Sequence, residues 1–322
     1  MTDLSIAIAT YDRPALLETT LRSCLAQTNA LGLAIEIVVV DNHPSGNGRE
    51  IVERLAATTA WPVRYVVDLT RNMSVLRNRG FAESRGGLVA FIDDDEVAAV
   101  DWLDQLVAAL RSAAADIAVG PRLAVFADEP PPYDPKGEQF ARDLHLPDGA
   151  LIDLTAPSGK PRYGLGTGNS LFDVARCFPA GESAMREEFG DAGGEDAELF
   201  VRLHRQGRRI VWAARAFVTE TVAPHRTDIA YRLLRVRRET QHYVSIYLDA
   251  ARYPRLVWAI LMGKGLLQLA AGAALAAMTA EFGSRRRLAG RLLMAHGLGK
   301  LRWRRAVGYI PEPSSKDTAS AS

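Results

Sequence analysis

The sequence predicts an α/β protein whose mostly parallel sheet carries helices on both faces, followed by a helical C-terminal region. Two observations lead to this fold class. Short apolar runs without polar alternation take turns with segments of helical periodicity, a pattern typical of parallel strands buried on both faces. Hydrophobic residues make up 48% of the 322 residues and charged residues 24%, which indicates a large buried core and not a disordered chain.

Strands and helices are expected to alternate through the first two thirds of the chain. Pro14 suits the first turn of a helix, and apolar residues follow it at helical spacing as far as Cys24. Another helix is expected to open at Glu195 and to end near Gly207. The predicted strands are the apolar runs 4–10, 35–40, 63–67, 88–92, 209–212 and 216–220.

The composition divides the chain into an α/β domain at residues 1–229, a helical region at 230–310 and a tail at 311–322 that we expect to be disordered. Within the first domain, residues 121–163 are Pro-rich and charged, and their apolar pattern has no clear period. Loops of this length inside a compact domain usually form a lid or bind a substrate. We therefore expect an insertion of that kind.

Residues 230–310 are both apolar and basic. They contain fifteen Lys and Arg against three Asp and Glu, a local net charge of +12 in a chain whose formal net charge is +1. Residues 256–280 are long enough to span a bilayer. However, Lys264, Gln268 and Gly272 fall on one helical face, as in a helix that lies at a membrane surface or packs on protein. We expect peripheral binding to an anionic membrane surface, with a buried hairpin and a transmembrane helix as the alternatives, and no nucleic-acid partner.

Cysteine content and the first residues bear on the compartment. Cys24 and Cys177 are the only cysteines, and they lack the spacing of metal ligands, so a reducing compartment is the natural reading. Leu4–Thr10 is apolar but short, and no basic segment or cleavage site frames it. We expect the protein at the cytoplasmic face of the inner (plasma) membrane.

Polar side chains follow three of the predicted strands at the point where each strand ends. In open α/β sheets, ligands bind in the crevice outside the carboxyl ends of the strands. Three polar clusters at one edge therefore predict a binding site there. The clusters are Tyr11-Asp12-Arg13, Asp41-Asn42 and Asp93-Asp94-Asp95.

Two acidic motifs have the chemistry expected of a catalytic site. Asp93 and Asp95 stand two residues apart, so both carboxylates can hold a hard divalent cation, which in turn neutralises a diphosphate. Glu195-Asp196 opens a helix, and a carboxylate there can act as a general base. Both motifs also suit helix N-termini, which acidic side chains stabilise without any catalytic role.

Five segments resemble the motifs of family 2 glycosyltransferases, which have the GT-A fold. Each is moderately specific, whereas their joint order and spacing over residues 4–220 is highly specific. The segments are Ser5–Pro14, Val38–Asn42, Leu76–Gly80, Phe91–Glu96 and Gly194–Asp196. The resemblance implies an enzyme that inverts the anomeric carbon of a nucleotide sugar by direct displacement.

The resemblance also implies roles for individual residues. Asp196 would be the base with Glu195 beside it, Asp41 would hydrogen-bond the base of the nucleotide (uracil in most relatives), and Asp95 would bind Mg²⁺ or Mn²⁺ with Asp93. The implied nucleotide-sugar pocket comprises Thr10, Tyr11, Asp12, Arg13, Asp41, Arg77, Asp93 and Asp94.

Three departures from the family pattern qualify these roles. Met73 stands where many relatives have a glycine, and Glu220 ends a strand where many place a histidine near the metal. Because a carboxylate also binds Mg²⁺ or Mn²⁺, Glu220 is a candidate ligand. The QXXRW motif of processive synthases is absent, and arginines at 232–238 follow instead. These features look most like the succinoglycan-type exopolysaccharide branch, which adds single sugars.

We therefore predict a metal-dependent hexosyltransferase that uses a UDP-sugar, UDP-glucose by preference. Its acceptor would be a lipid-linked oligosaccharide of a surface polysaccharide, contacted by the 121–163 insertion. Two alternatives remain at this stage. One is a nucleotidyltransferase on a related sheet, although Tyr11-Asp12-Arg13-Pro14 lacks the glycines of a phosphate loop. The other is a non-catalytic, membrane-associated subunit that binds sugar nucleotides.

Overall fold

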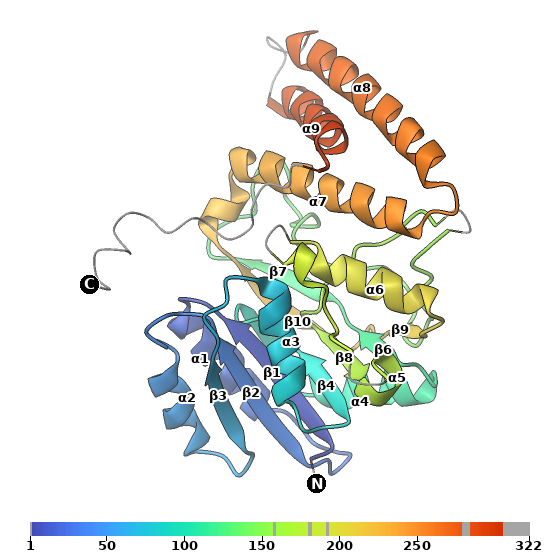
Figure 1. Ribbon diagram of the computed structural model, residues 1–322. Helices are drawn as coiled ribbons and strands as arrows, with labels where there is room; N and C mark the ends of the chain where they lie inside the picture. The colour runs from blue at the N-terminus through green and yellow to red at the C-terminus, as the bar shows by residue number, and fades with distance from the viewer. Residues whose placement is uncertain (1, 157–158, 180–181, 191–192, 279–283, 305–322) are drawn as a thin grey trace.

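The computed structural model describes residues 2–156, 159–179, 182–190, 193–278 and 284–304. It is an α/β body with the last helices stacked on one end (Figure 1). The tail at 311–322 lies outside the described residues, so the expectation for it is not addressed.

Four parallel strands form the first half of the main sheet. They are β1 (Leu4–Thr10), β2 (Ile35–Asp41), β3 (Val63–Val67) and β4 (Leu88–Phe91), in the order β3-β2-β1-β4. Every residue of β2 is buried, as expected for a largely apolar strand inside a parallel sheet, and the charged side chain near its start, Glu36, accepts a hydrogen bond from Ser5. The helices between these strands are α1 (Pro14–Leu25), α2 (Arg49–Ala56) and α3 (Met73–Glu83).

The second half of the sheet contains an antiparallel strand. β8 (Ser170–Asp173) lies between β4 and β6 (Ile117–Val119) and is antiparallel to both, while β9 (Ile210–Trp212) is parallel to β6. The associated helices are α4 (Trp102–Ser112), α5 (Val174–Cys177), α6 (Glu195–Arg205) and the short 3₁₀ helix η1 (Glu187–Phe189). Helices on both faces enclose two cores, one around Leu17, Trp102 and Leu106 and the other around Phe91, Phe172 and Phe200.

A second, three-stranded sheet lies at the edge where the polar loops gather. It contains β5 (Glu96–Ala98), β10 (Val218–Val222) and β7 (Arg122–Phe126), with β10 in the middle. The expectation of irregular structure throughout 121–163 was wrong for β7. Leu123 and Val125 of this strand are exposed, so β7 is not a strand buried in the core. Its pairing with β10 stabilises it instead.

The C-terminal region consists of helices α7 (Ile229–Ala250), α8 (Pro254–Met278) and α9 (Ser284–Leu301), after the 3₁₀ helix η2 (Pro224–Thr227). α7 lies against the body, with α9 and α8 beyond it (Figure 1). Ile246 of α7 packs on Val201 of α6. α8 and α9 approach closely through glycines: a Cβ at Gly272 would lie 2.7 Å from the carbonyl oxygen of Gly290.

α8 is the helix, in the part of the chain that the structure describes, that is long and apolar enough to cross a membrane. Its mean hydropathy is 1.5, and 17% of that apolar stretch is buried. Leu256, Leu266 and Leu267 are 60%, 60% and 72% exposed. The face of α8 turned away from α9 is therefore an apolar surface.

Candidate active site

The carboxyl ends of β1, β2 and β4 bring the predicted polar clusters together. Thr10 is level with Asp41 in the pairing of β1 with β2, and its hydroxyl donates to Asp94 Oδ2 at 2.8 Å. Arg13, at the start of α1, donates to Asp94 Oδ1 at 3.1 Å and to Asp95 Oδ2 at 3.0 Å. The sheet edge at which the sequence predicts the site thus brings Thr10, Arg13, Asp94 and Asp95 into contact.

The three consecutive aspartates have different environments. Asp94 is buried and held by Thr10 and Arg13. The side chain of Asp93 is 34% exposed, and its Oδ1 is 3.5 Å from Arg77 Nη2. Burial, with the nearby carboxylates of Asp93, Glu220 and Asp94, raises the pKa of Asp95 to about 7, against an opposing effect of Arg13. Negative charge is therefore in excess around Asp95.

This excess of negative charge fits a divalent cation. Asp93 and Asp95 supply hard oxygen donors, the type that Mg²⁺ and Mn²⁺ prefer. Among the described residues, however, no group of three or more His, Cys, Asp or Glu side chains forms a ready-made protein cage. An ion here would therefore rely on a few carboxylates together with water or substrate phosphate, which is the usual arrangement for Mg²⁺.

Glu220 is buried at the centre of β10 and is paired with two arginines. Its Oε1 lies 2.5 Å from Arg226 Nη1, and its Oε2 lies 2.9 Å from Arg122 Nε. Arg226 also approaches Asp95 Oδ2 at 3.9 Å. Glu220 is thus close enough to raise the pKa of Asp95, but both of its oxygens face guanidinium groups. Its role as a metal ligand stays a prediction.

Glu195 and Asp196 form the first turn of α6 and share one arginine. Arg77 Nη1 contacts Glu195 Oε1 and lies 2.9 Å from Asp196 Oδ1. Thr167 donates its hydroxyl to the same Asp196 oxygen at 2.9 Å. Burial raises the pKa of Asp196, whereas Arg77 acts in the opposite direction. Arg77 was predicted to approach the nucleotide. It is buried and links both α6 carboxylates to Asp93.

The helix start requires glycine at position 194. Gly194 has a φ of +91°, and a Cβ there would overlap the ring of His242 on α7. Glycine adopts this left-handed conformation without steric cost. Two constraints therefore fix the turn before Glu195 and Asp196: the left-handed backbone conformation of Gly194, and the close packing of His242 from α7.

Asp41 is fully buried at the end of β2 and organises the turn that follows it. Its carboxylate accepts from the backbone N–H of His43 at 2.7 Å, from Gly48 N–H at 3.2 Å and from the Tyr65 hydroxyl. Tyr11 is half exposed, with its ring centroid 5.7 Å from that of His43.

Asp12 joins this group with a φ of +52° and accepts from Asn47 Nδ2 at 2.9 Å. The structure thus brings Tyr11, Asp12 and Asp41 to one side of the crevice.

We call the following carboxylates, with the arginines that contact them, the acidic cluster: Asp93, Asp94, Asp95, Glu96, Glu195, Asp196 and Glu220. Sequence reasoning missed several of its residues. Glu96 is entirely buried and accepts from the backbone N–H of Asp93 at 3.0 Å. Arg122 and Arg226 neutralise Glu220. Thr167 contacts Asp196, and Arg142 is buried behind it. Gly166-Thr167-Gly168 was the available signal for Thr167, because a glycine pair often marks a close approach of the backbone, whereas no local pattern marks Arg142.

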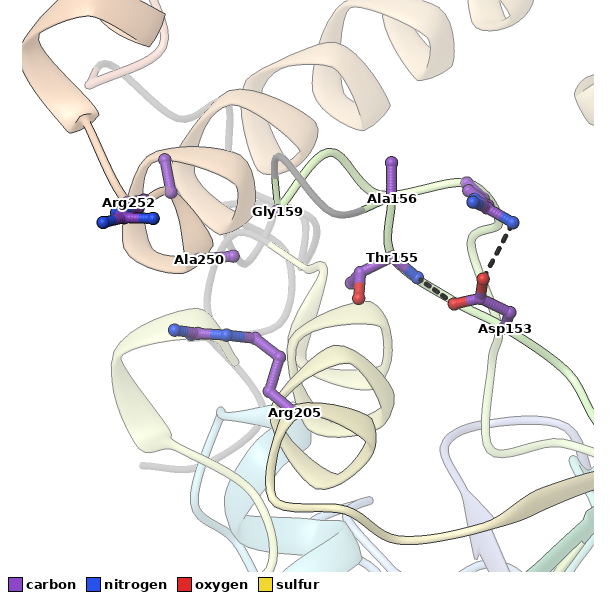
Figure 2. Close-up of a pocket in the computed structure, with 9 residues that line it drawn as sticks. Asp153, Thr155, Ala156, Gly159, Arg205, Ala250 and Arg252 are labelled. Carbon is purple, nitrogen blue, oxygen red and sulfur yellow. Dashed lines mark hydrogen bonds and ion pairs between the residues drawn. The ribbon is translucent and has the colours of Figure 1, made fainter.

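A cavity of about 480 Å³ lies away from the acidic cluster (Figure 2). It opens between the insertion, the end of α6 and the connection from α7 to α8. Asp153 and Thr155 of the insertion line one side, and Arg205 and Arg252 line the other (Figure 2). Because Arg205 ends α6 and Asp196 lies in its first turn, the helix connects this cavity with the acidic cluster.

Comparison with known sequences gives a consistent assignment. The family model described as "Glycosyl transferase family 2" matches residues 5–172. The succinoglycan biosynthesis protein ExoM of Rhizobium meliloti (strain 1021) is 29% identical over 259 residues, which cover 80% of each chain.

Solved structures share the fold. Staphylococcal TarS 1-349 (S. aureus), in complex with UDP, matches with a TM-score of 0.57 and 16% identity, covering 98% of this chain and 95% of that one. The mannosyltransferase PcManGT from Pyrobaculum calidifontis, in complex with GDP-Man and Mn²⁺, matches with a TM-score of 0.56 and 19% identity over 93% and 87% of the two chains. The predicted GT-A fold is confirmed.

Proposed function

Because the chain belongs to glycosyltransferase family 2, we propose that it is an inverting hexosyltransferase that uses a UDP-sugar, UDP-glucose by preference. The acceptor is a hydroxyl of a lipid-linked oligosaccharide in surface polysaccharide biosynthesis. The similarity to the succinoglycan biosynthesis protein supports the pathway class, and the likeness to a UDP complex supports the donor. Family membership disfavours the nucleotidyltransferase alternative.

The observation that carries the proposal is the position of Asp196 in the acidic cluster at the sheet edge, where Arg77 lies between it and Asp93. Asp196 Oδ1 is held by Arg77 and Thr167, both at 2.9 Å. In our proposal, Oδ2 takes the proton of the acceptor hydroxyl while the hydroxyl oxygen attacks the anomeric carbon. Arg77 keeps the carboxylate oriented, and no protein nucleophile is needed for a single displacement.

On the donor side, Tyr11, Asp12 and the turn organised by Asp41 bind the nucleoside. Arg13 and Arg226 place positive charge close to Asp95, where the diphosphate arrives. Mg²⁺ or Mn²⁺ held by Asp95 and Asp93, with Glu220 as a further candidate ligand, would neutralise the charge of the departing nucleoside diphosphate. The Mn²⁺ complex of a protein with this fold is consistent with such an ion.

The cavity in Figure 2 supports an anionic, lipid-linked acceptor. Arg205 and Arg252 line it next to the start of α8, whose Leu256 is exposed. Guanidinium groups bind phosphate oxygens well. A phosphate-linked lipid bound there would have its chain beside the apolar face of α8 and its sugars directed along α6 toward Asp196.

The same surface supports our proposal of attachment to the inner membrane. Each exposed leucine of α8 that becomes fully buried in the acyl layer stabilises binding by about 1.5–3 kcal/mol. The exposed Arg286, Arg287 and Arg291 of α9 add attraction to anionic lipid. Because α9 packs along α8, we propose that the hairpin lies on the cytoplasmic face as a peripheral anchor.

The decisive experiment measures nucleotide release from a panel of UDP- and GDP-sugars, with and without a membrane lipid extract. We expect release of UDP from UDP-glucose that depends on the extract, and a radiolabelled product that partitions into organic solvent. The Asp196→Asn variant is the inactive control. Absence of transfer from every donor in the presence of extract would favour the non-catalytic subunit.

A further inference from the structure

Arg142 lies in the insertion at 121–163 and its side chain is directed into the body. Its backbone is fixed to the first residue of β7 by two hydrogen bonds, Arg122 N–H to Arg142 O at 2.9 Å and Arg142 N–H to Arg122 O at 2.8 Å. Its guanidinium donates to the carbonyl oxygens of Gly120, Gly166, Gly168 and Asn169, at distances from 2.6 to 3.3 Å. The side chain thus joins the insertion to the loop that precedes β8.

The same loop contacts Asp196 on one side of the acidic cluster and Asp93 and Glu96 on the other. Thr167, between two of the carbonyls that Arg142 binds, donates to Asp196 Oδ1. A Cβ at Gly168 would lie 2.5 Å from Asp93 Oδ2 and 2.8 Å from Glu96 Oε1, so the loop backbone packs directly on these acids. Any shift of residues 166–169 would therefore move the partner of Asp196.

The hydrogen-bonding pattern suits arginine in particular. The five hydrogen bonds that the Arg142 guanidinium donates within the described residues all go to backbone carbonyl oxygens around its planar fork. A lysine ammonium has three donors and no fixed fork, so it cannot reach the same set of carbonyls. Burial lowers the pKa of Arg142 to about 10, and it remains a cation at neutral pH.

We propose that Arg142 is a positioning residue: it fixes loop 166–169 and, through Thr167, the orientation of the Asp196 carboxylate toward the acceptor. This inference rests on the proposed function, because it assigns Asp196 the role of base. It gives the insertion a second task besides contact with the acceptor, since a movement of the insertion would be transmitted to the base.

Steady-state kinetics of the full-length chain test the proposal. Arg142→Lys keeps the charge and loses the fork, and we expect kcat to fall roughly 10- to 100-fold, as for a catalytic group misplaced by a fraction of an ångström to one ångström. The KM for the UDP-sugar should stay unchanged. Thr167→Val, which removes only the hydroxyl that contacts Asp196, should lower kcat in the same direction. Arg215→Lys, an exposed arginine paired with Asp148 of the insertion, is the matched control and should retain wild-type kcat.

The double variant distinguishes positioning from a general structural effect. If Arg142 acts through Asp196, Arg142→Lys should change kcat very little in an Asp196→Asn background, because residues that act as a unit are non-additive. A full multiplicative loss in that background, or wild-type kcat in both Arg142→Lys and Thr167→Val, would overturn the inference. If Arg142→Lys does not fold, the kcat of Thr167→Val tests the inference, because that variant removes only the contact of the loop with Asp196. Failure of the proposed function is a separate result, namely no transfer by the wild-type protein.

Discussion

Substitution of Asp196 by asparagine tests the assignment of the base. The two contacts that position Asp196 are the 2.9 Å approaches of Arg77 and Thr167 to Oδ1, and an amide oxygen can accept from both. The variant therefore preserves the shape of the site while it removes the proton acceptor. A lost general base commonly costs 10²–10⁴-fold, so we expect kcat to fall by about that factor, or about 3–5 kcal/mol of transition-state stabilisation.

Initial rates of transfer, measured against the concentration of UDP-sugar, give kcat and KM separately. The KM for the donor should be nearly unchanged, because the removed charge faces the acceptor. Asp128→Asn, at an exposed position of the insertion, controls for the removal of one carboxylate. If Asp196→Asn weakened UDP binding as much as it lowered kcat, Asp196 would belong to the donor site and the reasoning would be refuted.

Four further outcomes are expected. Asp95→Ala should lower turnover roughly 10³-fold and weaken UDP binding measured by calorimetry, and full activity of the variant or in EDTA would contradict it. Glu220→Gln should raise the metal concentration that gives half-maximal activity. Unchanged metal dependence would mean that Glu220 pairs with Arg122 and Arg226 and does not bind the metal. Gly272→Ala should destabilise the packing of α8 on α9 by about 1–3 kcal/mol in thermal or denaturant unfolding, since a Cβ would lie 2.7 Å from a carbonyl oxygen. Gly263→Ala, with nothing within 4 Å, is its control and should not destabilise. Leu267→Glu should weaken binding to anionic liposomes in co-sedimentation, and equal binding by wild type and variant would remove α8 from the membrane contact.

The sheet and the acidic loops could be predicted because their signals are local. β1, β2 and β4 are predominantly apolar runs without regular polar alternation, and such runs have few alternatives to a buried parallel strand. Asp41 ends β2 and Asp93 lies two residues after β4, so their places at the sheet edge follow from the chain direction alone. The start of α6 at Glu195 was predicted for the same reason, as a glycine turn precedes an apolar helical period.

The partners of these acids could not be predicted, because they come from distant segments. Arg122 and Glu220 meet only because β7 and β10 are adjacent and parallel, a pairing of two strands about 90 residues apart that neither strand's own sequence indicates. Arg142 is one of three arginines in a charged, Pro-rich insertion. Its distinction is that its side chain is buried, which depends on how the insertion folds back on the loop before β8.

Arg77 shows how such partners change the interpretation of a motif. Family resemblance implies that it approaches the nucleotide, yet its guanidinium lies between Asp93 at 3.5 Å, on the proposed donor side, and Asp196 at 2.9 Å, on the proposed acceptor side. One buried cation therefore stabilises negative charge in both half-sites. Burial and the nearby charge of Asp93 raise the pKa of Asp196, whereas Arg77 lowers it and so favours the ionised carboxylate that a base needs. If Asp196 is the base that we propose, the arginine of the donor motif also keeps that base ionised on the opposite side.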